Sequence, residues 1–140
     1  MESPKCSFCF KKNETIDHFF IECAETKNNY LKVRNWLKRA QINFPDLNLE
    51  NVLIGYKGNS FENFLFILWK FVLYNSRIKQ KSPLLSDFQS IVKHYEKIEY
   101  IIAKKKSKLP CHLKKYDNIR TILMSTDTWK ISSEIININS

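Results

Sequence analysis

The sequence predicts a small, mostly α-helical protein. The chain has 140 residues, which corresponds to one domain, and 44% of them are apolar, which is enough for a packed core. Only two glycines and four prolines are present, too few for the frequent turns of a β-sandwich or barrel. Between Leu84 and Ile102 apolar residues recur every three or four positions, as on one face of a long helix. We therefore expect a bundle of about four helices.

Three of the four cysteines lie near a histidine at the start of the chain. Cys6 and Cys9 are separated by two residues, His18 follows after eight more, and Cys23 after another four. Two such thiolates reach one ion from a tight turn, and a His and a Cys from the next element complete a tetrahedron. A disulfide or redox pair is the weaker interpretation, because three local cysteines leave an odd thiol and no secretory signal is visible. The pattern predicts a CCHC clip holding one structural Zn²⁺, since four protein ligands leave no position for water.

The remaining cysteine and histidines are not expected to bind the metal. Cys111 and His112 are adjacent, and neighbouring residues seldom reach the same ion. His94 lies in a helical stretch with no obvious partner. We therefore expect none of these three residues to bind the metal, and we expect no role in acid–base chemistry for His94.

Residues 25–39 predict the first helix, because their apolar side chains fall on one face: Tyr30, Val33, Trp36 and Leu37. Phe44 and Pro45 end this pattern, and residues 49–59 are expected to be irregular. Ser60 is a suitable N-cap for the next helix. Eleven of the fourteen residues 61–74 are apolar, with Lys70 near the middle. We expect a helix buried almost all round, the alternative being a hydrophobic face that docks on a partner; the segment is too short to cross a bilayer core of roughly 30 Å.

The periodic stretch from Leu84 to Lys106 predicts the longest helix, and the lysines at its end lie at the negative end of the helix dipole. Pro110 prevents its continuation, and a short helix is expected over 112–124. The sequence thus divides into a zinc-binding module with its following helix (1–40), a helical region (41–124) and a weakly ordered tail (125–140) with Trp129 as an anchor.

The formal charge of +9 is concentrated in one part of the chain. Residues 1–50 contain eight basic and seven acidic side chains, whereas residues 77–115 contain eleven basic and three acidic ones. A local excess is typical of an anion-binding surface. A solvated lysine-rich helix face, or AT-rich codons that favour Lys, Asn and Ile, would give a similar composition.

Residues 4–37 resemble a known motif. The stretches Lys5-Cys-Ser-Phe-Cys9 and Glu14-Thr-Ile-Asp-His18-Phe-Phe-Ile-Glu-Cys23 are similar to the zinc-binding region that follows the polymerase domain in non-LTR (LINE-type) retrotransposon reverse transcriptases. That family has a tryptophan in the next helix, a place that Trp36 fills. The run from Phe64 to Tyr74, with the basic residues and Pro83 after it, resembles the family's helical tail less specifically. The chain has no paired-aspartate polymerase motif, so we expect a non-catalytic fragment.

The resemblance implies contact with RNA or DNA, and the basic segment suggests where. Six lysines flank Pro110 and are the candidate phosphate-binding residues: Lys104, Lys105, Lys106, Lys108, Lys114 and Lys115. Nearby Tyr95, Tyr100 and Tyr116 are of the type that stacks on bases, although Tyr95 belongs to the apolar stripe. The alternatives are a scaffold module that binds an adjacent reverse transcriptase domain or another protein, and a decayed transposon fragment. We expect an intracellular protein, in nucleus or cytoplasm, with no membrane and no small-molecule substrate.

Overall fold

The structure, a computed structural model, describes residues 4–123 and is built from helices. The tail predicted over 125–140, with Trp129, lies outside the described residues. No β-strand occurs in the described part, where Lys5 and Asn13 form one isolated antiparallel bridge. The elements are a one-turn π-helix and five α-helices: η1 (His18–Glu22), α1 (Ala24–Lys38), α2 (Leu49–Leu53), α3 (Ser60–Ile78), α4 (Leu85–Lys105) and α5 (Leu109–Leu123). The predicted fold class is confirmed.

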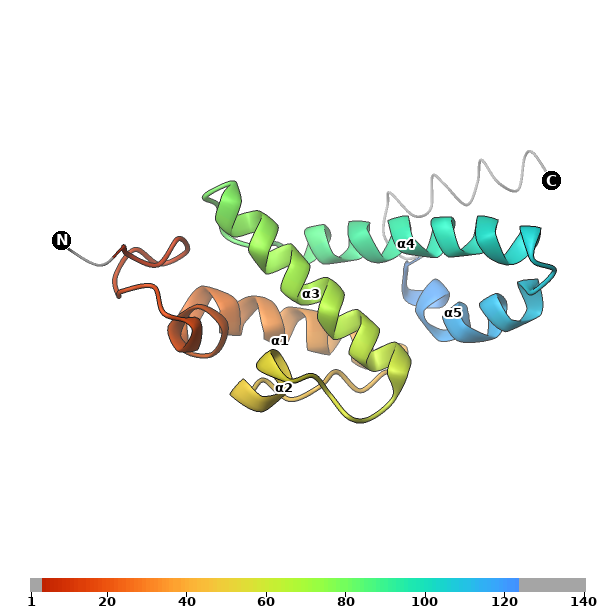
Figure 1. The fold of residues 1–140 in the computed structure, drawn as a ribbon, viewed down its shortest axis with the longest axis horizontal. Coiled ribbons are helices and arrows are strands. Elements are labelled where there is room, and N and C mark those ends of the chain that lie inside the picture. Colours follow the sequence, from red (N-terminus) through yellow and green to blue (C-terminus); the bar gives the residue numbers. More distant parts are fainter. Residues whose placement is uncertain (1–3, 124–140) are drawn as a thin grey trace.

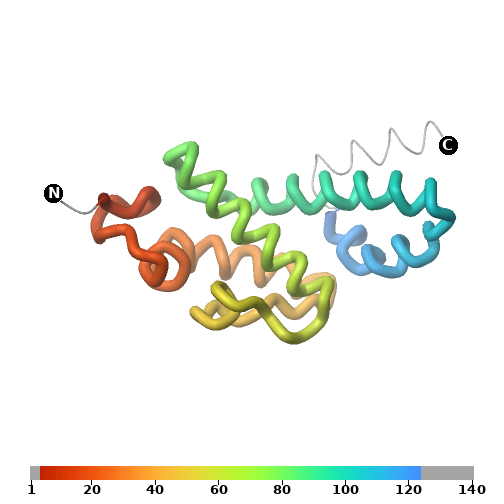
Figure 2. The backbone as a smooth tube through the Cα atoms, in the orientation of Figure 1, coloured from red at the N-terminus to blue at the C-terminus, as the bar shows by residue number. Residues whose placement is uncertain are grey.

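The helices form an elongated arrangement (Figure 1). The N-terminal loop and η1 lie at one end, α1 and α3 cross in the middle, and α4 and α5 form an antiparallel hairpin that reaches the other end. The continuous trace of the backbone shows that the turn between α4 and α5 is the point farthest from the N-terminal loop (Figure 2). We call this turn, together with the end of α4 and the first half of α5 beside it (residues 104–115), the elbow. The cysteine-containing loop and the elbow are therefore separate surfaces.

The core is centred on α3 and is rich in aromatic rings. Trp69 is fully buried, and its ring lies 5.6 Å from that of Tyr30 in α1 and 6.0 Å from that of Phe44. Phe44 in turn lies 6.2 Å from Phe88 of α4. The indole Nε1 of Trp69 donates a 2.8 Å hydrogen bond to Oδ1 of Asn29, which satisfies the ring's polar atom inside the core. Three helices thus share one aromatic cluster.

Two predictions about α3 are wrong in detail. The N-cap is Asn59, whose side chain accepts hydrogen bonds from the backbone N–H groups of Phe61 and Glu62, and not Ser60. The helix is also not buried all round. It contacts the core along one face, and the opposite face leaves large side chains about half exposed: Ile67, Phe71, Tyr74 and Ile78. Composition alone predicted burial, but no helix within residues 4–123 covers this face of α3.

The other helices follow the predictions with local differences. The segment 49–59, expected to be irregular, contains the short helix α2, which Asn48 caps by accepting from the N–H of Asn51. In α5 the helix begins at Leu109, and Pro110 lies in its first turn, where a missing N–H costs nothing. The apolar stripe of α4 is buried only in its first half, at Phe88 and Val92. Farther along it is exposed, because α5 packs on a different face of α4.

No helix within residues 4–123 has the combined length and apolar character needed to cross a membrane.

Candidate metal centre

The first two cysteines lie in a tight loop that the backbone closes. The N–H of Cys6 donates to the carbonyl of Lys12 at 2.8 Å, and the N–H of Phe10 donates to the carbonyl of Cys6 at 3.0 Å. Phe10 has a positive φ of 58°, which lets the chain reverse direction directly after Cys9. The loop therefore directs both thiols to the same side.

The other two ligands come from η1 and its end. The hydroxyl of Thr15 accepts a 3.0 Å hydrogen bond from the N–H of His18 and so fixes the start of η1. Cys23 ends η1, with its N–H donating to the carbonyl of His18 at 2.7 Å, and it occupies the N-cap position of α1. The π-helical turn brings His18 and Cys23 to one side, facing the cysteine loop.

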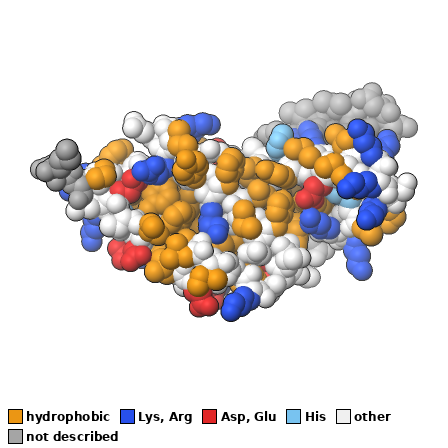
Figure 3. All heavy atoms as spheres, viewed as in Figure 1, with side chains coloured by type: hydrophobic (Ala, Val, Ile, Leu, Met, Phe, Trp, Pro, Cys, Tyr) orange, Lys and Arg blue, Asp and Glu red, His pale blue; other side chains and the backbone are white. Residues whose placement is uncertain are grey.

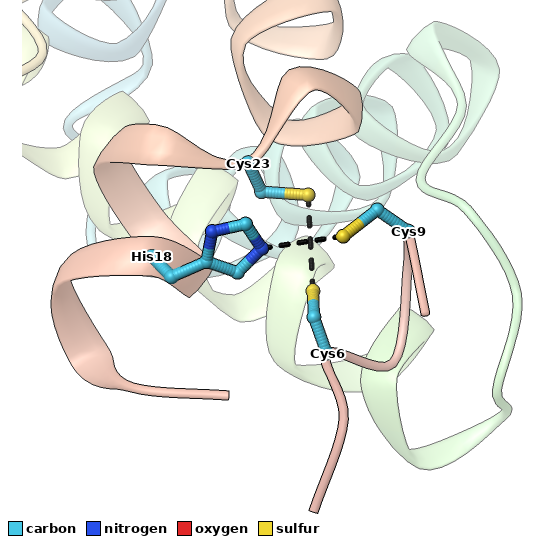
Figure 4. A group of neighbouring side chains, drawn as sticks. All are labelled: Cys6, Cys9, His18 and Cys23. Carbon is cyan, nitrogen blue, oxygen red and sulfur yellow. Dashed lines mark hydrogen bonds between the residues drawn. The ribbon is translucent and has the colours of Figure 1, made fainter. Parts of the chain in front are cut away.

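The four side chains converge on one point (Figure 4). Their ligand atoms all lie within 4.8 Å of one another. Sγ of Cys6 is 3.8 Å from Sγ of Cys23, and Sγ of Cys9 is 3.3 Å from Nε2 of His18. Around a tetrahedral zinc ion the corresponding separations would be about 3.8 Å and about 3.6 Å. Cys6, Cys9, His18 and Cys23 therefore lie close enough to hold one metal ion, as the spacing predicted.

The environment of the thiols differs from one cysteine to the next. Burial raises the pKa of the Cys6 thiol to about 11, whereas the backbone N–H of Lys11, donating to the half-buried sulfur of Cys9, lowers the pKa of that thiol to about 6. A cation at the centre would favour the thiolate form of both. The imidazole Nδ1 of His18 is buried and has no hydrogen-bond partner among the described residues, so the contact of Nε2 with Cys9 and the packing around the ring orient it.

A salt bridge joins the metal loop to α3. The carboxylate of Glu14 accepts two hydrogen bonds from the guanidinium of Arg77, at 3.1 and 2.9 Å, and one from the hydroxyl of Ser7 at 3.0 Å. Arg77 lies 63 positions farther along the chain, so sequence reasoning had no signal for this pair. Glu14 and Thr15, however, lie in the stretch whose spacing predicted the metal centre, and both have a structural role in it.

The three residues excluded as ligands lie far from this cluster in the fold. Cys111 is exposed on α5, and His94 is exposed on α4. His112 is buried, and its Nε2 lies 3.0 Å from a carboxylate oxygen of Glu96, which also contacts Arg120 at 3.1 Å. The structure thus gives His112 a place in a buried polar cluster between α4 and α5.

All six candidate lysines lie at the elbow and are exposed. Lys115 differs from the others because its ammonium group lies 3.1 Å from Glu99 and 5.1 Å from the centre of the Phe64 ring. The remaining five form no ion pair with any residue in the described range. Of the three tyrosines considered for stacking on bases, Tyr116 is fully buried and Tyr95 packs on Phe64. Tyr100 is partly exposed and is the one of the three that remains a candidate for stacking.

Comparisons of the chain with protein-family models, curated proteins and solved structures find no match. The similarity of residues 4–37 to the LINE-type zinc region therefore stays a prediction from the motif.

Proposed function

We propose that the chain is a non-catalytic nucleic-acid-binding module that holds one structural zinc ion. The observation that carries this proposal is the group of five lysines at the elbow without acidic partners in the described structure, at the opposite end from the metal centre. The metal stabilises the fold at one end, and the elbow contacts phosphates at the other.

Zinc is the metal that suits the ligands best. Three sulfurs and one imidazole nitrogen are soft or borderline donors, whereas Mg²⁺ and Ca²⁺ require oxygen ligands. With four protein ligands the ion has no open position for a substrate, which favours a structural role. In small sites of this kind zinc binding contributes on the order of 10 kcal/mol to folding at neutral pH.

The elbow carries a cluster of exposed lysines, which is the kind of surface that binds a polyanion such as a nucleic acid. Lys104 and Lys105 lie in the last turn of α4, Lys106 is its C-cap, and Lys108 and Lys114 follow in the turn and in α5. If all five neutralise phosphates, the logarithm of the affinity for duplex DNA should fall with the logarithm of salt concentration with a slope of about −4.5. The motif resemblance supports the same function, because proteins of the LINE type handle RNA and DNA during target-primed synthesis.

The test compares two triple variants of the zinc-loaded chain. Lys104, Lys105 and Lys106 are replaced by Glu in one variant, and three exposed lysines of α1, namely Lys27, Lys32 and Lys38, are replaced by Glu in the other. Both variants carry the same net charge, so only the position of the charge differs. We expect the elbow variant to lose RNA and DNA binding in fluorescence anisotropy at low salt, and the α1 variant to keep most of it. Undetectable binding by the unmodified chain, or equal losses in both variants, would contradict the proposal.

A second candidate function is a protein-interaction module, and the exposed face of α3 favours it. On this face Ile67, Phe71, Tyr74 and Ile78 are spaced four, three and four residues apart, as in the seam of a helix that packs on another helix. Figure 3 shows hydrophobic side chains gathered over and beside α3. If neither lysine variant changes nucleic-acid binding, this function becomes the better one. Its natural partner would then be an adjacent reverse transcriptase domain.

A further inference from the structure

A cavity of about 250 Å³ lies at the elbow, between the last turns of α4 and the first turns of α5. Its walls include the side chains of Ile102 and Ala103 from α4 and of Cys111 from α5. Lys106 and Lys108 also line the cavity, and both are exposed. The cavity therefore combines apolar walls with two cations and lies within the lysine group described above.

The charge balance at this cavity favours an anionic ligand. The one carboxylate that lines it belongs to Glu99, and the ammonium group of Lys115, which also lines it, neutralises that carboxylate at 3.1 Å. Lys106 and Lys108 are left without an acidic partner among residues 4–123. A ligand that suits both parts has an apolar, flat portion joined to a phosphate.

Two other cavities in the described structure have a smaller excess of cations. The cavity between α3 and α4, about 280 Å³, is lined by Lys79 and Lys81, but also by Asp87. The cavity beside the metal centre, about 310 Å³, is lined by two lysines, but also by Glu22 and Glu25. The elbow cavity, lined by three lysines and one glutamate, has the largest excess of lysines over carboxylates of the three.

We propose that the elbow cavity receives one unpaired nucleobase, so that the protein prefers single-stranded RNA or DNA to a duplex. This inference rests on the proposed nucleic-acid-binding function and specifies its substrate. In a duplex the bases are stacked and paired, so a duplex reaches the elbow only through its phosphates. In a single strand a base can turn outward and contact apolar side chains while its neighbouring phosphates contact lysines.

The size of the cavity and the position of the lysines favour a strand over a free nucleotide. Pockets for drug-sized ligands have volumes of about 300–1,000 Å³, so this cavity accommodates a single ring system and leaves the sugar and phosphate outside. Three further lysines, Lys104, Lys105 and Lys114, do not line the cavity but lie nearby along α4 and α5. A mononucleotide would leave them unused, whereas successive phosphates of a strand extend past them.

The experiment measures the affinity of the zinc-loaded chain for a short fluorescent single strand and for the duplex of the same sequence, over a range of salt concentrations. We expect the single strand to bind about tenfold more tightly at moderate salt, since burial of one base against apolar side chains adds a contribution that does not depend on salt. The salt slope should be shallower for the single strand, about −3.5 against about −4.5, if five lysines engage in both cases.

A variant that fills the cavity tests its role. Cys111 is exposed, so Cys111→Leu places a larger aliphatic side chain in the cavity without disturbing the core and without offering a ring on which a base could stack. It should lower the affinity for the single strand about tenfold and leave the affinity for the duplex unchanged, because the added side chain occupies the space of the base. Thr121→Leu, which adds the same side chain at an exposed position of α5 that does not line the cavity, is the matched control and should change neither affinity. Ile102→Ser, which makes the wall polar without filling the cavity, is a second variant expected to act like Cys111→Leu.

The possible outcomes separate this inference from the proposed function. Equal affinity for single strand and duplex overturns the inference and leaves nucleic-acid binding intact, whereas absence of binding to either overturns both. Binding of a mononucleotide such as AMP as tightly as the strand contradicts the strand preference. Binding to phosphatidylserine vesicles that Cys111→Leu abolishes, without any preference for single strands, would assign the cavity to lipid instead.

Discussion

Glu14 is the single residue that most directly connects the metal loop with the helices. Its side chain is 11% exposed, and it accepts hydrogen bonds from Arg77 and from Ser7. The guanidinium of Arg77 holds the pKa of the Glu14 carboxyl below its ordinary value of 4.5. A charge-assisted, two-point contact of this kind fixes orientation as well as distance. We therefore expect Glu14 to determine how the metal loop sits on α3.

Replacing Glu14 by Gln should destabilise the protein at neutral pH by about 1 kcal/mol. The expected loss is small because Arg77 is partly exposed, so solvent screens the salt bridge. Because the pKa of Glu14 is lowered on folding, its contribution is present above pH 4.5 and is lost as the pH falls through the folded-state pKa. Urea denaturation between pH 7 and pH 3 measures this directly. The unfolding free energies of the two proteins should converge toward pH 3, while the exposed control Glu50→Gln should track the unmodified chain throughout. A constant difference at all pH values would show that Glu14 acts through its shape and not its charge.

Glu96 lies in a different environment, because its side chain is 4% exposed and contacts both His112 and Arg120. Loss of one partner from a buried ionic cluster costs about 3–5 kcal/mol, since the remaining charged or polar groups lose their compensation. We predict a loss near the lower end of this range for Glu96→Gln, which keeps a polar side chain. The surface pair of Glu99 and Lys115 provides the comparison, and Glu99→Gln should cost less than about 1 kcal/mol. Chemical denaturation of the two variants checks the contrast, and similar losses in both would contradict it.

At the level of elements, the periodicity of apolar residues predicted where the helices occur. It did not predict which faces of those helices are covered by other elements. The apolar spacing from Leu84 to Ile102 correctly indicated α4, but Ile98, Ile101 and Ile102 are exposed. A stripe shows which residues share a face, and only the tertiary arrangement decides whether a neighbour covers that face. In α4 the face that carries Glu96 packs on α5 instead, which is why a carboxylate is more deeply buried than three isoleucines.

The start of α3 offers a test at the element scale. Asn59→Ala should destabilise the protein by about 1 kcal/mol, because two backbone N–H groups lose the side-chain oxygen that they share. Ser60→Ala should have little effect, since Ser60 is the first helical residue and caps nothing in this structure. Thermal unfolding of the two variants followed by circular dichroism distinguishes the positions. A larger loss of stability for Ser60→Ala than for Asn59→Ala would show that Ser60 is the N-cap, as the sequence indicated.

At the scale of the whole molecule, the sequence predicted both surfaces but not their separation. The four metal ligands were identified from local spacing, because all of them lie within eighteen consecutive residues. The lysines were identified from local charge. Their positions at opposite ends of the molecule depend on how α1, α3 and α4 pack, which no local pattern encodes (Figure 1). The link from Glu14 to Arg77 was missed for the same reason.

The separation has a consequence for metal removal. A chelator, or Cys23→Ser, should unfold the metal loop and η1, because all four ligands come from this short segment and zinc binding at such sites contributes much of the folding free energy. The elbow lies far from the metal, and its lysines are presented by α4 and α5, whose mutual packing includes the Glu96 cluster. Hydrogen exchange should therefore rise steeply in residues 4–23 and only modestly in 85–123. A uniform rise across the chain would show that the metal supports the whole fold.

Metal analysis of the protein purified without chelator tests the central claim most directly. The four converging ligands predict one equivalent of zinc per chain, and replacement of the zinc by Co²⁺ should give the visible absorption of a tetrahedral site with thiolate ligands. Cys111→Ser should retain the full metal content, since Cys111 lies outside the cluster, whereas Cys23→Ser should lower it. A metal content near zero, or an equal loss in both variants, would contradict the assignment of Cys6, Cys9, His18 and Cys23 as the metal centre.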